Sequence, residues 1–451
     1  MPLGLEWRAS YWFTTLVVGS GIAIDLLVYS IIIPVIPFQL EQLGYDGVSG
    51  LAGWLLFAYT SHIATFPIAV LSERYSSRRW PLILGFVMLI ASQIMFMEAP
   101  NYAVMCIARV LQGISSSIVW VVGLALLCDC TPEKLIGQQL GLAMVGFSIG
   151  LVLGPPIGGA LYERFGFRGP FVFGIIFSVA DLIGRFVIIE RAESIKWGVD
   201  PLVPNPPGGD AEKDAPPAEE NTEEPKAKPL SFIAVMGKLI RSPRAVAAFL
   251  LTLLYGRVNF VQEPSIPVHL QTVWNLTSEK VGIVFIAAVV PTLFSGPLTG
   301  WIVDRWGTEW ITPLCLILAV PWFVAMSIES KLGLFIAAFG LSSFFGSGVL
   351  PPLTAELAAV ARGIEGVGYG HVYGAFNAAF GAGSTIGPVI GGQLYDHLEN
   401  GWQAVVYLAA GMAALGALIS IYSTGDDPLL KATWRRIRRR SSLASGSDAT
   451  S

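Results

Sequence analysis

Two stretches of the chain repeat each other: Gly150-Leu-Val-Leu-Gly154-Pro155-Pro156-Ile-Gly158-Gly159-Ala-Leu-Tyr162-Glu163 and Gly383-Ser-Thr-Ile-Gly387-Pro388-Val-Ile-Gly391-Gly392-Gln-Leu-Tyr395-Asp396. Both keep the pattern G-x3-G-P-x2-G-G-x2-Y followed by an acid, so that Gly150 corresponds to Gly383. A second pair of similar stretches, 69–76 and 300–307, is separated by nearly the same length of chain. Two repeats at nearly one offset predict a parallel duplication, which is one of the known plans of membrane transporters.

The composition places most of the chain out of water. Hydrophobic residues make up 53% of the chain and charged residues 13%, where soluble domains average about 25% charged residues. A membrane-spanning helix needs about 20 mainly apolar residues. Twelve stretches meet this need, at 12–38, 48–71, 80–98, 101–128, 137–161, 169–190, 244–270, 280–303, 310–328, 332–359, 367–394 and 402–424. The sequence therefore predicts an all-α membrane protein with twelve transmembrane helices in two pseudo-symmetric six-helix halves.

One long polar segment, 191–240, separates the predicted halves 1–190 and 241–425. It is rich in Pro, Glu and Lys and buries too little apolar surface to fold, which predicts a disordered linker. A basic tail, 426–451, follows the last span.

The distribution of Lys and Arg predicts the orientation, because these residues are enriched in cytoplasmic loops. With the N-terminus inside, four basic residues fall in outer loops, namely Arg164, Arg168, Lys280 and Lys331. Thirteen fall on the inner side, namely Arg8, Arg74, Arg78, Arg79, Lys134, Arg305, Arg362, Lys431, Arg435, Arg436, Arg438, Arg439 and Arg440. Both termini and the linker are therefore expected in the cytoplasm.

Several motifs together resemble a known family. An acid–Arg loop follows the second and eighth spans, and the fourth span carries Arg109-Val-Leu-Gln112-Gly113, which is similar to an R-x2-Q-G motif. With the twelve spans and the glycine-proline motif of the fifth, these features resemble the major facilitator superfamily over residues 10–425. The fifth-span motif resembles the signature of the proton-coupled antiporters of that superfamily.

Within the superfamily, the chain looks most like the vesicular amine transporters and related drug:proton antiporters. The first span has Asp25 followed by Pro34 and Pro37, and the seventh has Gln262-Glu263-Pro264-Ser-Ile-Pro267. The eleventh has Gly370-His-Val-Tyr373-Gly374, and Asn377 stands where those transporters usually have an aspartate. The resemblance implies proton-driven export of small organic compounds.

Three ionisable residues inside predicted spans are the main candidates for coupling. A charge inside the membrane costs about 2.5–3.5 kcal/mol on insertion scales, so each such residue is a functional candidate. Asp25 and Glu263 are predicted to bind protons or substrate. Asn377 is a further candidate for this role, because it stands where the related transporters usually have an aspartate. Asp25 alternatively has a conformational role, and Glu263 alternatively forms a salt bridge with Arg257 at the outer gate. Arg109 is implied by the resemblance to tune the proton affinity of a nearby acid, or else is a permanent hydrogen-bonding clamp.

Other residues have predicted supporting roles. Side chains available to line a substrate cavity are Tyr29, Trp120, Arg257, Asn259, Gln262 and Tyr373. Asp181 and Arg185 are spaced i, i+4 and are expected to neutralise each other as a structural pair. Glu356 lies near the cytoplasmic end of the tenth span, where it can simply face water.

The glycines of the fifth span recur every four residues, so they lie on one helix face and let a neighbouring helix come close. The antiporter-type motif comprises Gly150, Gly154, Pro155, Gly158 and Gly159. A purely structural packing role and a role in antiport are compatible. The loop residues expected to latch the cytoplasmic gate in an outward-open state are Glu73, Arg74, Arg78, Asp304 and Arg305.

These observations predict a transporter that exports small organic, partly apolar compounds, cations included, by proton-coupled antiport through alternating access. The alternative is a facilitator or proton symporter that imports a small polar metabolite. No nucleophile–base pair or metal-ligand spacing is visible, so no enzymatic activity, cofactor or metal is expected. Partners are the substrate, protons and lipid, without nucleic acid, and the protein is expected to act as a monomer. The cell membrane is the expected location, in preference to a vacuolar or vesicular membrane.

Overall fold

The computed structural model describes residues 4–60, 78–132, 135–200, 232–364 and 369–425, together with residues 2, 68 and 428. Glu73 and Arg74 of the predicted gate lie outside these residues. The side chains of Asp304, Tyr373 and Asn377 also lie outside the description.

All regular elements of the described residues are helices. In chain order they are α1 (Leu5–Arg8), α2 (Tyr11–Ser30), α3 (Ile36–Gln42), α4 (Val48–Thr60), α6 (Arg79–Met97), α7 (Tyr102–Cys130), α8 (Ile136–Phe165), α9 (Arg168–Val187), α10 (Arg191–Ser194), η3 (Ile195–Trp197), α11 (Phe232–Arg241), α12 (Pro243–Phe260), α13 (Ser265–Trp274), α14 (Ser278–Trp306), α15 (Thr308–Ala325), α16 (Leu332–Ser347), α17 (Leu350–Gly363), α18 (Tyr369–His397) and α19 (Gly401–Ser423). Ten spans within the described residues are long and apolar enough to cross a membrane. The two other predicted spans contain α4 and α18.

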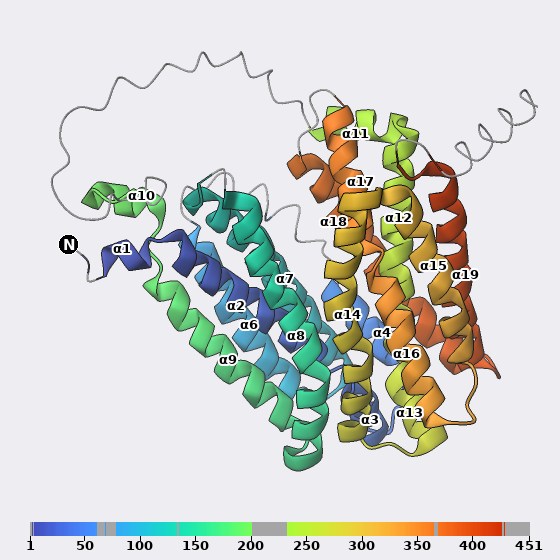
Figure 1. Ribbon diagram of the computed structural model, residues 1–451. Coiled ribbons are helices and arrows are strands. Elements are labelled where there is room, and N and C mark those ends of the chain that lie inside the picture. Colours follow the sequence, from blue (N-terminus) through green and yellow to red (C-terminus); the bar gives the residue numbers. More distant parts are fainter. Residues whose placement is uncertain are drawn as a thin grey trace, which may run out of the picture.

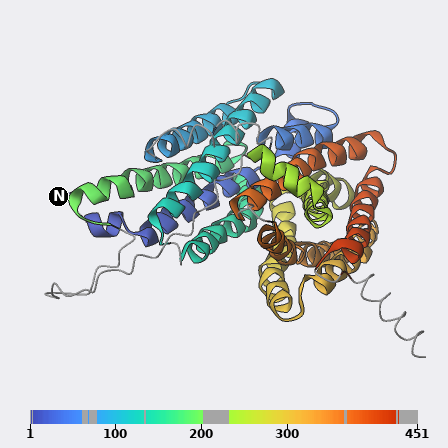
Figure 2. The same cartoon turned by 90° about the horizontal axis from the view of Figure 1, so that it is seen from above.

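The helices form two groups, one before and one after the predicted linker (Figures 1 and 2). In the N-terminal half α2 packs on α8, and in the C-terminal half α12 packs on α18. The main contacts between the halves join α4 to α18 and α8 to α14. Each glycine-proline helix therefore packs on the first helix of its own half and on a helix of the other half.

Three predicted spans are interrupted where proline removes a backbone donor. The first is divided into α2 and α3 just before Pro34, and the seventh into α12 and α13 just before Pro264. The tenth is divided into α16 and α17 just before Pro351. In the seventh span this break contains Glu263.

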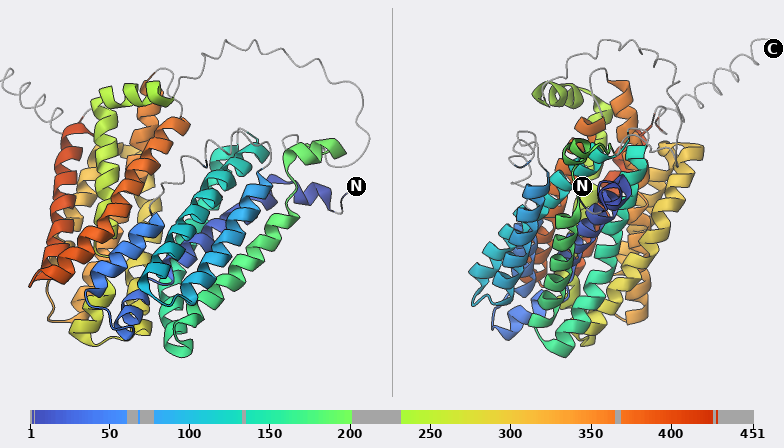
Figure 3. Two further views of the ribbon diagram at one scale, coloured as in Figure 1. Left: turned by 180° about the vertical axis from the view of Figure 1, so that it is seen from behind. Right: turned by 90° about the vertical axis from the view of Figure 1, so that its left-hand side faces the viewer.

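The two halves converge at one end of the molecule and diverge at the other (Figures 1 and 3). We call the converging end, which bears α3 and α13, the closed face, and the end that bears α1, α10 and α11 the linker face. At the closed face Ser49 Oγ and Ser265 Oγ lie 3.0 Å apart, and Gln271 Nε2 donates to Glu41 Oε2 at 2.6 Å. Both contacts join one half to the other.

The glycine motifs allow this packing. A Cβ added at Gly158 would overlap the carbonyl of Ile31 in the first span, and one at Gly391 would overlap that of Val261 in the seventh. The next glycine of each motif faces the other half, because a Cβ at Gly159 would overlap the Ser278 carbonyl. At Gly392 it would meet the carbonyl of Ser49 in the same way. The predicted packing role of the motif is confirmed.

The surface of the bundle carries large apolar side chains, as expected where lipid replaces water. Leu84, Ile176, Phe294 and Leu418 are each at least 60% exposed. Inside the N-terminal half, Arg185 Nε donates to Asp181 Oδ2 at 3.0 Å, and both side chains are 1% exposed. The predicted structural pair is confirmed.

Two sequence predictions about polar residues are wrong. The segment 191–240 is not structureless throughout, because α10, η3 and α11 form at its two ends. Glu356 does not face water, since it is 2% exposed and pairs with Arg244 at 2.5 Å. It also accepts hydrogen bonds from Thr308 Oγ1 at 3.0 Å and from the Gly425 amide at 3.1 Å.

Candidate functional site

Asp25 lies in the C-terminal half of α2, fully buried and held by side chains from two other helices. Ser116 Oγ and Trp120 Nε1, both on α7, donate to Oδ2 at 2.6 and 3.0 Å. Tyr59 Oη, on α4, donates to Oδ1 at 2.9 Å. Three donors satisfy the charged form of the carboxylate, so the site can hold it ionised without a cation in direct contact.

Glu263 lies in the break between α12 and α13, and its side chain meets the other half of the protein. Tyr29 Oη, one turn beyond Asp25 on α2, donates to Glu263 Oε2 at 2.7 Å. The proline-induced break places Glu263 at this position, since Pro264 ends the regular hydrogen bonding of α12. The hydrogen bond therefore joins the two halves of the protein.

Arg109 connects the two carboxylates through aromatic rings. Its guanidinium carbon lies 5.1 Å from the ring centre of Tyr59 and 6.0 Å from that of Tyr29. The two rings are themselves 4.9 Å apart. Such cation–π contacts are worth about 2 kcal/mol when desolvated. Arg109 thus lies against both of the phenols that bind the acids.

The guanidinium of Arg109 is incompletely paired. Nη1 donates to Gln112 Oε1 at 3.0 Å, while Nε and Nη2 are buried without a partner among the described residues. No carboxylate of the described residues lies within ion-pair distance of it. Because an unpaired buried donor costs free energy, this arginine is poised to bind an anionic group that approaches.

The structure therefore brings together five of the predicted residues, namely Asp25, Glu263, Arg109, Tyr29 and Trp120, the last of which donates a hydrogen bond to Asp25. The suggested Arg257–Glu263 ion pair is not formed in this structure. Glu263 binds Tyr29 instead, and Arg257 Nε has no partner within the described part of the chain. Gln262 is buried, and its Oε1 likewise accepts nothing from the described residues.

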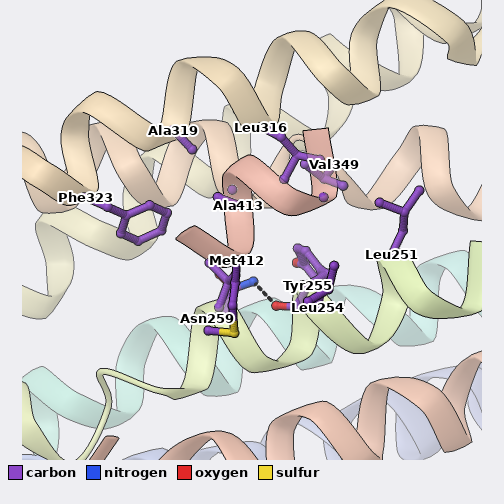
Figure 4. Close-up of a pocket in the computed structure, with 13 residues that line it drawn as sticks. Leu251, Leu254, Tyr255, Asn259, Leu316, Ala319, Phe323, Val349, Met412 and Ala413 are labelled. Atoms are coloured by element: carbon purple, nitrogen blue, oxygen red, sulfur yellow. Dashed lines mark hydrogen bonds between the residues drawn. The ribbon is translucent and has the colours of Figure 1, made fainter. Parts of the chain in front are cut away.

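Asn259 lies apart from these residues, at an apolar pocket inside the C-terminal half (Figure 4). The pocket is lined mainly by apolar side chains of α12, α15 and α19, such as Leu251, Phe323 and Met412. Asn259 Nδ2 donates to the carbonyl of Tyr255 at 2.7 Å, within its own helix. The described lining of this pocket offers a substrate no charged group.

Two contacts of the predicted gate residues each lie within one half. Arg78 Nε pairs with Asp129 Oδ2 at 3.1 Å, inside the N-terminal half. The guanidinium carbon of Arg305 lies 4.2 Å from the ring centre of Trp301, one turn earlier on α14. Arg78 precedes the first residue of α6 and Arg305 lies in the last turn of α14.

The sequence matches the profile of the Major Facilitator Superfamily over residues 18–262 and 248–447. The chain belongs to the major facilitator superfamily. It is 24% identical to the MFS-type transporter ppzB of Metarhizium rileyi over 472 residues, covering 94% of this chain and 97% of the relative. It is 26% identical to the human synaptic vesicular amine transporter over 360 residues, covering 77% of this chain and 62% of that protein.

Among solved structures, a bacterial homologue of the human lysosomal transporter Spinster, in an inward-facing and unoccupied conformation, superposes with a TM-score of 0.67. Its sequence is 14% identical, and the match covers 92% of this chain and 98% of that one. The predicted membership of the superfamily and the predicted fold are confirmed. This superfamily member is an integral multi-pass membrane protein and a transporter.

Sequence reasoning missed three residues of the site, Tyr59, Ser116 and Gln112. Tyr59 lies in the middle of the predicted span 48–71, and it was not singled out there as a partner of Asp25. Ser115-Ser116-Ser117 in α7 was a signal, because consecutive hydroxyls are unusual in a span and one of them binds Asp25. Gln112 was noted only as part of a motif. In the described residues no group of His, Cys, Asp and Glu is arranged to hold a metal ion.

Proposed function

We propose that this transporter exports small organic, partly apolar compounds, cations included, in exchange for protons. The observation that carries the proposal is the pair of carboxylates, the buried Asp25 of one half and Glu263 of the other, whose hydrogen-bond donors Tyr59 and Tyr29 have ring centres 4.9 Å apart. Protonation of a carboxylate that contacts the other half changes the contacts between the halves, and so changes the equilibrium between their arrangements. The likeness to amine transporters supports a cationic substrate in the same region.

Charge balance within the site supports proton coupling. Asp25 and Glu263 can carry two negative charges, and Arg109 supplies one positive charge beside both tyrosines. Since net charge in the membrane interior is costly, the site favours one bound proton, or one bound cation in its place. Exchange of a proton for a cationic substrate keeps the net charge of the site constant.

The exchange follows from alternating access of the two faces. With the closed face outside, as the positive-inside distribution predicts, the cytoplasmic substrate enters from the linker face and displaces the proton. When the halves rotate, protonation from outside releases the substrate. Return of the protonated carrier then resets the cycle.

The test is flux in proteoliposomes with an imposed pH gradient, using ethidium as the probe cation. We expect Asp25→Asn to abolish gradient-driven ethidium movement, because a neutral amide cannot exchange a proton for a cation. Asp46→Asn, which changes an exposed acid before α4, is the matched control and should keep wild-type flux. Full gradient dependence in Asp25→Asn would contradict the proposal.

The same assay separates antiport from the import alternative. Antiport moves the probe against the direction of proton flow, whereas a symporter moves its solute with the protons and a facilitator ignores the gradient. A compound screen that compares resistance and retained solute in cells with and without the protein would identify the natural substrate. The cell membrane remains the expected location.

A further inference from the structure

The acid that ends each glycine-proline motif lies at the closed face, where it meets a helix of the other half. Asp396, at the end of α18, accepts a hydrogen bond through Oδ2 from the Gly50 amide at 2.5 Å. Gly50 is the third residue of α4, whose first amides have no partner within the helix. Asp396 thus binds the N-terminus of a helix that belongs to the N-terminal half.

The corresponding acid of the first motif makes the corresponding contact. Glu163 Oε2 accepts a hydrogen bond from Ser278 Oγ at 3.3 Å, and Ser278 is the first residue of α14. Glu163 and Asp396 occupy the same place in the two copies of the motif. The duplication therefore places one carboxylate at each of the two helix N-termini where the halves meet.

Neither helix has a cap from the residue that precedes it. Gly47, which precedes α4, has no side chain and adopts a positive φ of 63°. Thr277, which precedes α14, makes no side-chain hydrogen bond to the helix start. Helices normally begin with a side chain that accepts from these amides. Asp396 supplies that acceptor to α4 across the interface, whereas Glu163 binds the hydroxyl of the first residue of α14.

Small residues make room for Asp396 in particular. A Cβ at Gly50 would come within 2.9 Å of Asp396 Oδ2 and 2.7 Å of Gln393 Nε2. Asp396 is half-buried, whereas Glu163 is exposed and reaches a hydroxyl at a longer distance. An anion at a helix N-terminus also interacts favourably with the helix dipole. Of the two contacts, that of Asp396 is therefore the stronger.

We propose that Asp396 is a positioning residue for transport, which holds the closed face shut by capping α4 of the opposite half, with Glu163 as its weaker counterpart. This inference rests on the proposed function in one respect, that the halves separate at this face during the cycle. Opening the face withdraws both carboxylates, which leaves the N-terminus of α4 without its side-chain cap and removes the Glu163 contact from Ser278 of α14. The free energy of that loss biases the resting protein towards the state in the structure.

The test measures how often the closed face opens, with no substrate and no pH gradient. Ser265→Cys places a thiol at a buried point of this face, opposite Ser49. The four native cysteines, Cys106, Cys128, Cys130 and Cys315, are replaced by alanine. An impermeant maleimide then labels the introduced thiol from outside in intact cells. We expect Asp396→Asn to raise the labelling rate about fivefold, the factor for a change near 1 kcal/mol.

Three variants sharpen the result. Glu399→Gln, which neutralises an exposed acid three residues further on, should leave labelling unchanged. Asp396→Glu keeps the charge and should label more slowly than Asp396→Asn, whereas Glu163→Gln should raise the rate by less than Asp396→Asn does. Equal labelling rates in Asp396→Asn and Glu399→Gln would overturn the proposal.

Hydrogen exchange of the purified protein provides a second measurement if the alanine background folds poorly. Asp396→Asn in the native chain should then speed exchange across both α4 and the start of α14. If exchange were faster only in the first turn of α4, Asp396 would stabilise that helix alone. This result would overturn the proposal that Asp396 holds the closed face shut. Unchanged labelling together with normal ethidium flux would disprove the latch alone, whereas loss of gradient-driven flux in the wild type would disprove the antiport proposal alone.

Discussion

Asp25 in α2 and Tyr255 in α12 occupy corresponding positions, yet the first is a buried carboxylate and the second borders an apolar pocket. The correspondence follows from packing, because Gly158 lies on Ile31 as its counterpart Gly391 lies on Val261. Counting back equally from these two contacts leads to Asp25 and Tyr255, and likewise to Tyr29 and Asn259. One half therefore holds an acid and its donors where the other holds a phenol and an amide.

This difference shows how the duplicated chain divides its tasks. The glycine seams and helix-capping acids are kept in both halves, because both halves must pack and close in the same way. The charged site is built mainly in the N-terminal half, and the C-terminal half contributes Glu263 from its broken helix. The features shared by both halves are thus those that pack the helices, whereas the charged residues of the site differ between the halves.

The largest effect that would test this division is expected at Arg109. Arg109→Gln removes the cation that lies against both tyrosines and leaves two acids without compensation. Breaking a buried charge arrangement costs about 3–5 kcal/mol, so transport should fall at least about 100-fold. Flux per mole of reconstituted protein measures this, with the Tm of the purified variant as the control for folding. Near-normal flux in Arg109→Gln would place the coupling elsewhere.

An intermediate effect is expected from the two tyrosines, because the acids differ in their number of partners. Tyr29→Phe removes the one hydrogen bond found for Glu263 among the described residues, whereas Tyr59→Phe leaves Asp25 with Ser116 and Trp120. A hydrogen bond to a charged group is worth about 1.5–3 kcal/mol. Flux should fall roughly tenfold in Tyr29→Phe and less in Tyr59→Phe. The reverse order would contradict the assignment of Tyr29 as the link between the halves.

The smallest effect is expected in the C-terminal pocket. Asn259→Leu removes a side chain that donates only to its own helix and adds apolar volume beside an apolar pocket. Ethidium flux and its dependence on the pH gradient should therefore stay within about twofold of the wild type. A large loss of flux with an unchanged Tm would show that the pocket takes part in transport.

The fold could be predicted from the sequence because its determinants are local. The repeated motif, the apolar spans and the prolines at the breaks are visible along the chain, and the Asp181–Arg185 pair is spaced i, i+4. Arg109 and Asp25 were noticed because charges are rare in spans. What joins them could not be predicted, because Tyr59 and Ser116 become neighbours of Asp25 only when α4, α7 and α2 pack together.

The errors have the same origin. Glu356 seemed free by its place near a helix end, but its partners Arg244, Thr308 and Gly425 come from three other parts of the C-terminal half. A salt bridge between Arg257 and Glu263 was suggested as an alternative because the two residues are close in sequence. The bend at Pro264 instead turns Glu263 towards Tyr29, 234 residues away.

The contacts of Glu356 have a consequence for synthesis of the chain. Arg244 leaves the ribosome first, and its carboxylate partner follows 112 residues later. The Gly425 amide, which closes the cluster, comes a further 69 residues along, at the end of the last span. The ends of α12, α15 and α19 at the linker face therefore join around one buried acid only after the last span has been translated. Until that point Glu356 lacks the Gly425 amide as a donor.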